Sequence, residues 1–206
     1  MAERKKREKA SRAAGTVPGA EWNGADLSGQ SHTGVTFVDL DMGECRNDGA
    51  TFTECTFRRV QFNCSVHTDA AFVNCRFVNC DLFDTRFTEC KLVGSSFERC
   101  TYDLLQVSGG NWSHVALPAA DLRKATFRDV RLREADLTGA RFDGAVLRDC
   151  DLSGASLQGV VLTECDLRGS DLSALEPENA ALKGAIITAV QALTIAEALG
   201  LDVRAE

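Results

Sequence analysis

Large hydrophobic residues recur at every fifth position of this chain. From Trp22 to Leu172 the register is unbroken over 31 positions, and 28 of them are apolar. A second series, two residues before each large one, holds mostly alanine, cysteine or valine. The repeating unit therefore reads small, polar, large, polar, polar, as in ADLSG at 25–29.

A period of five residues matches neither the 3.6 of an α-helix nor the 2 of a plain β-strand. A fixed short period is typical of a solenoid, in which stacked coils share one core. We expect the chain to turn after each five-residue face, with the large and the small side chain inside and the other three in water. Neighbouring coils would then pair by backbone hydrogen bonds at a spacing of about 4.8 Å.

This pattern resembles that of the pentapeptide-repeat proteins over about three quarters of the chain. The resemblance implies an all-β fold, a right-handed quadrilateral β-helix with four repeats per coil, so that residues twenty apart stack in about eight coils. We expect residues 1–20 to be a disordered basic tail and residues 21–184 to form the β-helix. Residues 185–206 are expected to form a C-terminal helix that caps the end and mediates dimerisation.

Two places depart from the repeat. Asn47 occupies a large slot and stacks beneath His67, so we expect a buried polar pair whose side chains hydrogen-bond each other or water. Between residues 102 and 114 the small slots hold Leu105 and Gly110. We expect a local bulge there, which is a candidate partner contact.

The C-terminal segment has the signals of a helix. Thr188 and Gln191 have the spacing of a capping box, and Gly200 supplies a stop. Between them only a narrow stripe is polar, so one apolar side can plug the open end of the β-helix and another can bind a second copy. The expected contacts of this homodimer are Ile187, Val190, Leu193, Ile195 and Leu199.

The N-terminal segment is basic. Residues 1–12 hold six basic and two acidic side chains, which is typical of a solvated tail, with a nucleic-acid-binding arm as the alternative. No other direct contact with nucleic acid is expected. No apolar core follows these charges, and no apolar stretch is long enough for a membrane span, so we expect a cytoplasmic protein.

Few residues offer reactive chemistry. Eight of the nine cysteines occupy the small inward slot, where a buried thiol behaves as a small hydrophobe, and only Cys64 is a candidate for reactivity. The three histidines lack metal-ligand spacing, and the acidic residues at 39–44 lack the glycine and the closing ligand of a calcium loop. We expect no catalytic residue, no metal and no cofactor.

The charge is distributed unevenly. The chain has a net charge of −7, and without the basic tail the remainder carries −11. When outward residues are assigned to four faces, one face dominates, with nine acids against Arg123, Lys124, Arg141 and Lys183. Such a face either solubilises the rod or mimics a polyanion such as DNA. Its acids are Glu21, Asp41, Glu44, Asp81, Asp84, Asp103, Asp121, Asp143 and Glu164.

Three segments resemble the MfpA and Qnr group of fluoroquinolone-resistance proteins: FTECKLVGSSFERC at 87–100, LLQVSGGNWSHVALPAADL at 104–122 and QALTIAEALGL at 191–201. The resemblance implies a dimeric DNA mimic that binds and inhibits DNA gyrase and counters quinolones or gyrase-targeting toxins. The basic tail is extra, and the loops of Qnr proteins have no clear counterpart. The alternative is a generic pentapeptide-repeat scaffold for another protein partner; an enzyme is disfavoured because a filled β-helix offers no pocket.

Overall fold

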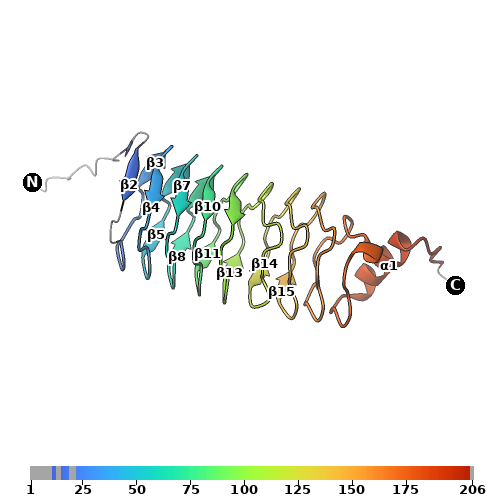
Figure 1. Cartoon of the computed structure of the whole chain (residues 1–206). Helices are drawn as coiled ribbons and strands as arrows, with labels where there is room; N and C mark the ends of the chain where they lie inside the picture. The colour runs from blue at the N-terminus through green and yellow to red at the C-terminus, as the bar shows by residue number, and fades with distance from the viewer. Residues whose placement is uncertain (1–10, 13–14, 19–21, 205–206) are drawn as a thin grey trace, which may run out of the picture.

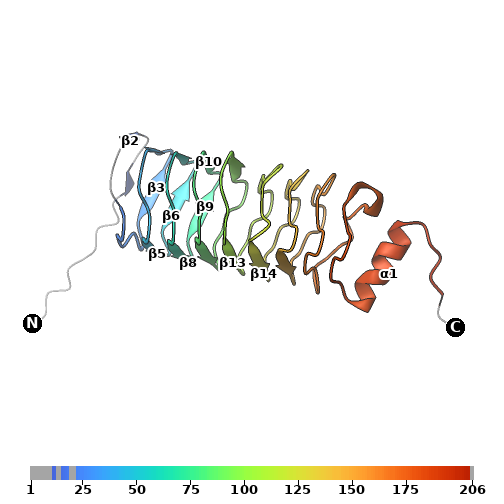
Figure 2. The same cartoon turned by 60° about the horizontal axis from the view of Figure 1, so that its bottom comes forward.

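The chain forms an elongated, four-sided solenoid whose short strands run across its long axis (Figure 1). The structure is a computed structural model that describes residues 11–12, 15–18 and 22–204. Strand β2 (Thr16–Pro18) lies near one end, and helix α1 (Ala189–Ala198) lies at the other (Figure 2).

Strands pair in parallel with strands twenty residues away, as Thr51 pairs with Ala71. Three faces carry sheets of such strands. The first contains β1 (Ser11–Arg12), β3 (Ser31–Thr33), β6 (Thr51–Thr53) and β9 (Ala71–Val73). The second contains β2, β4 (Thr36–Val38), β7 (Thr56–Arg58), β10 (Arg76–Val78) and β12 (Ser96–Glu98). The third contains β5 (Arg46–Asp48), β8 (Val66–Thr68), β11 (Arg86–Thr88), β13 (Gln106–Ser108), β14 (Thr126–Arg128) and β15 (Val146–Arg148).

The fourth face pairs by isolated bridges, such as Asp41 with Gln61 and Gln61 with Asp81. Similar bridges continue the other ladders toward the C-terminus, as far as the pair Asp166 and Ile186. About six turns therefore carry regular strands, and the turns that follow keep the same twenty-residue step. The prediction of a four-sided β-helix with a C-terminal helix is confirmed.

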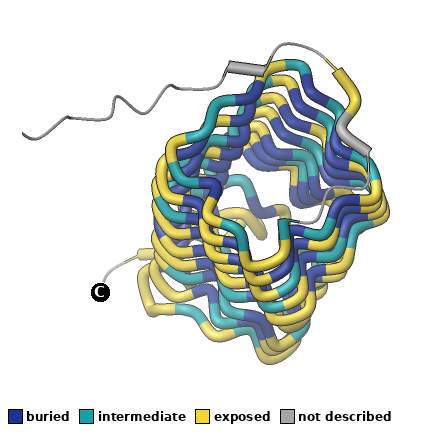
Figure 3. Tube along the Cα trace, turned by 90° about the vertical axis from the view of Figure 1, so that its left-hand side faces the viewer, coloured by how far each residue is buried: buried dark blue, intermediate teal, exposed yellow. Residues whose placement is uncertain are grey.

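The core is one continuous column of large and small side chains. Figure 3 looks along the rod and shows buried positions lining its inside while exposed positions form the corners. Rings twenty residues apart stack: the centroids of Phe57 and Phe77 lie 4.9 Å apart, and those of Phe77 and Phe97 lie 4.5 Å apart. Each such pair adds about 1 kcal/mol beyond the apolar area that it buries.

The corners explain why the repeat has five residues. The last residue of most repeats has positive φ, as in Asp84 (45°) and Gly144 (66°), and this turns the chain onto the next face. Glycine tolerates this conformation best, and polar residues with short side chains follow it. Two inward and three outward residues per five-residue repeat are the geometric consequence.

The polar pair in the core is confirmed. The Nδ2 of Asn47 donates to the Nδ1 of His67 at 3.1 Å, and the Nε2 of His67 lies 2.9 Å from the Oγ of Ser65. Burial lowers the pKa of His67 to about 3. The imidazole is therefore neutral, and each of its nitrogens has a partner.

The bulge expected between residues 102 and 114 is not formed, so that prediction is wrong. The ladder keeps its register there: Gln106 N–H donates to Thr85 O at 3.0 Å, and Asn111 N–H donates to Cys90 O at 2.9 Å. The irregularity is confined to Gly110, which has φ +88° in a small slot, where an added Cβ would lie 2.2 Å from Cys90 O. Glycine absorbs the deviation without an inserted loop.

Pairing begins before the predicted boundary at residue 21. Ser11 of β1 pairs with Ser31, and Val17 of β2 pairs with Phe37, in the same twenty-residue register as the rest. Part of the segment expected to be a disordered tail is therefore strand. Residues 1–10, which hold most of its basic residues, lie outside the described residues.

The C-terminal helix closes the last coil. After the 3-10 turn η1 (Pro177–Asn179), Thr188 begins α1 with the predicted capping box, in which Thr188 N–H donates to Gln191 Oε1 at 2.8 Å. The Nε2 of Gln191 then donates to Leu167 O at 2.7 Å and to Ser170 O at 2.8 Å. The contact between helix α1 and the last coil is thus partly polar, because this coil leaves backbone carbonyl groups that need hydrogen-bond donors.

Candidate functional site

The face that pairs by isolated bridges carries the acidic residues predicted for partner binding. Glu21 lies outside the described residues, and the structure places the other eight on this face, which we call the acidic face. Four of them are exposed: Glu44, Asp103, Asp121 and Glu164. The other four are half-buried: Asp41, Asp81, Asp84 and Asp143.

The N-terminal part of this face, residues 41–104, carries no lysine or arginine at its outward positions. We call it the anionic section, and neutral donors hold two of its carboxylates. Asp41 accepts from Asn23 Nδ2 at 3.1 Å and from the Gly43 N–H at 2.8 Å. Asp81 accepts from Thr101 Oγ1 at 2.6 Å and from the N–H of Phe83 at 3.1 Å. These bonds order the carboxylates without cancelling their charge.

Two acids of the anionic section contact cations at its borders. Asp84 lies 3.4 Å from an Arg86 nitrogen on the adjoining face and also accepts from Gln106 Nε2 at 3.1 Å. Asp103 lies 3.5 Å from Lys124 Nζ in the next coil. Both contacts lie at the surface and reach solvent, where such pairs contribute little to stability and are screened by salt. The anionic section therefore remains strongly negative. Its five acids are Asp41, Glu44, Asp81, Asp84 and Asp103.

Residues 121–184 of the same face form a mixed section, in which acids and bases alternate. Arg123 donates two hydrogen bonds to the carboxylate of Asp121, from Nε at 2.7 Å and from Nη2 at 2.6 Å. These bonds lower the pKa of that carboxyl. Arg141 lies 3.4 Å from Asp143. The acidic stripe predicted along the whole rod is thus concentrated at residues 41–104.

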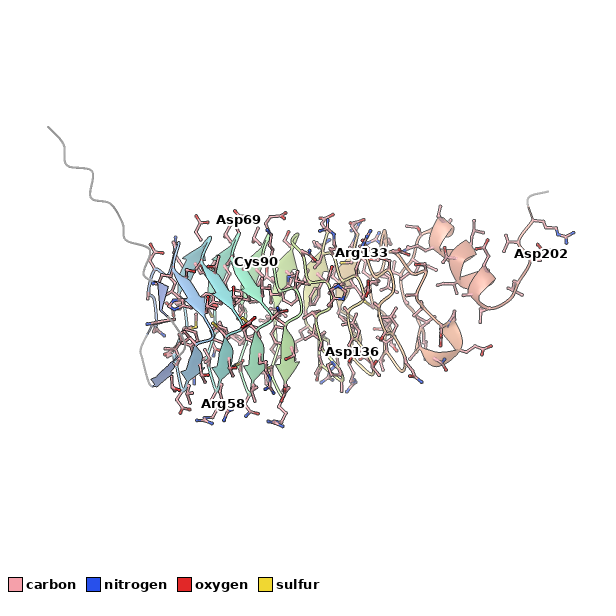
Figure 4. The ribbon with its side chains drawn as sticks, turned by 90° about the horizontal axis from the view of Figure 1, so that it is seen from above. Arg58, Asp69, Cys90, Arg133, Asp136 and Asp202 are labelled. Carbon is pink, nitrogen blue, oxygen red and sulfur yellow. The ribbon has the colours of Figure 1, made fainter. Side chains whose placement is uncertain are left out.

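On the other faces, acidic and basic side chains of neighbouring coils form ion pairs. Arg59 binds Asp39 at 2.6 Å and Arg76 binds Glu98 at 2.7 Å, each across neighbouring coils. Figure 4 shows charged side chains such as Asp69 projecting outward from the ribbon. Within the described residues, the anionic section gathers more acids without a base on the same face than any comparable stretch, five against three at positions 116–179 of the face that carries β4.

The structure offers little for catalysis or metal binding. In the described part of the chain, no three His, Cys, Asp or Glu side chains gather as metal ligands would. The cysteines in small slots are buried or half-buried, and burial raises the pKa of Cys90 to about 12, whereas Cys64 is exposed as predicted. A buried thiol of this kind is a poor nucleophile.

The expected dimer contacts separate into two groups. Ile187 and Ile195 pack against the core at the last coil, whereas Val190, Leu193 and Leu199 are exposed. Exposed apolar residues near them extend the same surface, which we call the end surface. The additional members are Ile186, Leu201 and Val203.

The sequence reasoning missed two residues of the acidic face. Phe83 and Leu104 are exposed in the last two coils of the anionic section. The available signal was that Phe83 alone among the 11 phenylalanines falls outside the five-residue register.

Comparison with known proteins identifies the repeat. The family model for pentapeptide repeats matches eight copies, over residues 68–101, 113–149, 140–174 and 150–188. The chain belongs to the pentapeptide-repeat family. No curated protein matches the chain.

Two solved structures have a similar fold. Full-length QnrB1, a plasmid-mediated fluoroquinolone resistance protein, matches with a TM-score of 0.63 and 18% identity, covering 92% of this chain and 100% of QnrB1. A trypsin-treated QnrB1 variant matches with a TM-score of 0.59 and 21% identity, over 95% of this chain and 100% of the variant. Within residues 11–12, 15–18 and 22–204, no helix has the length and apolar character needed to cross a bilayer.

Proposed function

We propose that this pentapeptide-repeat protein is a DNA mimic without catalytic activity that binds and inhibits bacterial DNA gyrase and counters quinolones or gyrase-targeting toxins. The observation that carries the proposal is the anionic section, which presents ordered carboxylates on one side of a narrow rod. The fold that this chain shares with QnrB1, a fluoroquinolone resistance protein, supports the same proposal.

The charge density is of the right order for such mimicry. From the coil of Asp41 to the coil of Asp103 there are three ladder steps of about 4.8 Å, or about 14 Å in all. Duplex DNA presents about eight phosphate charges over that length. The anionic section presents five carboxylates. A basic groove that selects DNA by its charge and width is therefore expected to bind this surface as well.

The end surface supports a homodimer as part of the proposal. Its apolar side chains surround a helix that already closes one solenoid, so a second copy is the partner that would bury them by two-fold symmetry. Light scattering is expected to give twice the 22.2 kDa chain mass at micromolar concentration. Val190→Glu, at a side chain that is 73% exposed, is expected to give the monomer without loss of the fold. A monomeric wild type would contradict this part.

The test of the gyrase proposal is a supercoiling assay titrated with this protein, with and without a quinolone. The triple variant Asp81→Lys, Asp84→Lys and Asp121→Lys is expected to lose inhibition, since it reverses charge on the acidic face. The matched control is Glu54→Lys, Glu134→Lys and Asp171→Lys, three exposed acids on the opposite face. Equal inhibition by both variants would remove the mechanism.

The generic scaffold remains the second candidate. It is favoured by the low identity to the solved structures, at 18 and 21%. Unchanged supercoiling at every concentration of wild-type protein would favour it, because the acidic face would then only solubilise the rod.

A further inference from the structure

The solenoid exposes few large hydrophobic side chains. Within residues 22–184, the exposed ones are Val66, Phe83 and Leu104, with 39, 41 and 45% of their surface in solvent. They lie in consecutive coils: Cys64 N–H donates to Phe83 O at 2.8 Å, and Asp84 N–H donates to the carbonyl before Leu104 at 2.9 Å. Val66 lies around the corner on the third face, paired in the ladder with Arg46 and Arg86. We therefore call Phe83 and Leu104, with the exposed thiol of Cys64, the edge patch.

Core packing does not account for Phe83. The ten other phenylalanines are buried in large slots, where they build the stacked column. Phe83 instead occupies an outward slot between Asn63 and Asp103, where polar residues are the rule. An aromatic ring at such a position forgoes most of the hydrophobic free energy that burial would give.

Local conformation does not account for Leu104 either. This residue turns a corner with φ +60°, and the glycines Gly24, Gly144 and Gly184 serve the same corner position on this face. A side chain with a Cβ costs about 1–2 kcal/mol in that conformation. Leu104 keeps 45% of its surface in solvent, so burial offsets little of this cost and the fold alone does not favour leucine at this position.

The surroundings of the edge patch indicate the chemistry of what covers it. The carboxylates of Asp81, Asp84 and Asp103 border it, and all belong to the anionic section. Nucleic acids and anionic lipid surfaces would be repelled by them. An apolar recess ringed by lysine and arginine side chains on a protein is complementary in both respects.

We infer that the edge patch is an apolar anchor that inserts Phe83 and Leu104 into such a recess on a basic protein surface. The inference rests on the proposed function, since it takes gyrase as the protein that carries this surface. Charge then guides the approach of the partners, while the anchor supplies affinity that salt does not screen. A polyanion mimic with no anchor would lose its affinity almost entirely at high salt.

The test is the affinity for purified gyrase at low and high salt, about 0.1 M and about 0.5 M. The double variant Phe83→Ser and Leu104→Gly is expected to bind about tenfold more weakly at both salt concentrations, as hot-spot residues do. The matched control is Val73→Thr, a half-buried apolar residue on the opposite face, which is expected to bind like wild type.

If the double variant has a lowered melting temperature, the single variant Leu104→Gly is tested in its place. Glycine adopts this positive φ readily, so this variant is expected to preserve the fold. It is expected to bind about threefold more weakly. Gyrase binding by wild type together with wild-type affinity in both variants would overturn this inference and leave the proposed function standing. No binding by wild type at low salt would overturn the proposed function, and this inference with it.

Discussion

The anionic section and the mixed section share one face, one backbone and one ladder, yet they present opposite electrostatics. Residues 41–104 carry five acids and no base on the face, whereas residues 121–184 carry three acids and four bases. Inside, both are filled in the same way, with Phe62 and Leu82 in one and Phe142 and Leu162 in the other. The core thus fixes two positions in five, and the remaining three are free to encode recognition.

Charge reversal is expected to separate the two sections most strongly. Asp81→Lys with Asp103→Lys is expected to weaken gyrase binding about 100-fold at low salt, since two attractive contacts become repulsive. Asp143→Lys with Glu164→Lys changes the charge equally in the mixed section and is expected to have an effect of under about threefold. Titration calorimetry measures both affinities. Equal losses in the two variants would mean that the two sections do not differ in function.

The core behind the anionic section is expected to be the acid-sensitive part. The pKa of His67 is about 3 in the folded protein and about 6.5 in an unfolded chain, so below pH 6.5 the unfolded state binds the extra proton. Stability is therefore expected to fall by about 1.4 kcal/mol per pH unit from pH 6.5 toward pH 3, with no such effect above pH 6.5. At pH 5, amide hydrogens near His67 are expected to exchange faster than those of the coils at 121–184, which hydrogen-exchange measurements would show.

The control for this effect removes the polar pair as a whole. Asn47→Leu with His67→Phe keeps large side chains in both slots, and the new ring would continue the stack onto Phe87, whose centroid lies 4.9 Å from His67. The variant is expected to melt with a shallower pH dependence. The same pH dependence in both proteins would assign the acid sensitivity to other groups.

The smallest change in gyrase affinity is expected from a substitution at the border between the anionic section and the mixed section. Arg123→Gln releases Asp121 from its two-bond ion pair, so the pKa of this carboxyl is expected to rise toward its ordinary value. The change also extends the negative surface by one coil, and gyrase affinity at low salt is expected to increase about threefold. NMR titration follows the carboxyl, and binding assays follow the affinity. Weaker binding would indicate that Arg123 itself contacts the partner.

The five-residue register predicted the fold because inward positions obey one geometric rule. The same rule located the pair Asn47 and His67 and the capping box at Thr188, where the partners are fixed by stacking or by local spacing. It failed at Gly110, since a missing side chain can signal either an inserted loop or a close approach of two backbones, and only the second occurs.

The outward positions were harder to interpret. Sequence placed eight acids on one face correctly, because their positions follow from the twenty-residue step. It did not show that Arg123 neutralises Asp121 while Asp81 is held by neutral donors, since such contacts depend on side-chain conformation. The polar role of Gln191 also depended on the carbonyls left open by the last coil.

Competition with DNA tests the central claim most directly. A short duplex bound to gyrase and carrying a fluorescent label is titrated with the protein, and the anisotropy of the duplex is measured. DNA mimicry predicts full displacement by wild type and a midpoint about 100-fold higher for the Asp81→Lys and Asp103→Lys variant. A stable complex of gyrase with both the duplex and the protein, at unchanged duplex affinity, would contradict DNA mimicry.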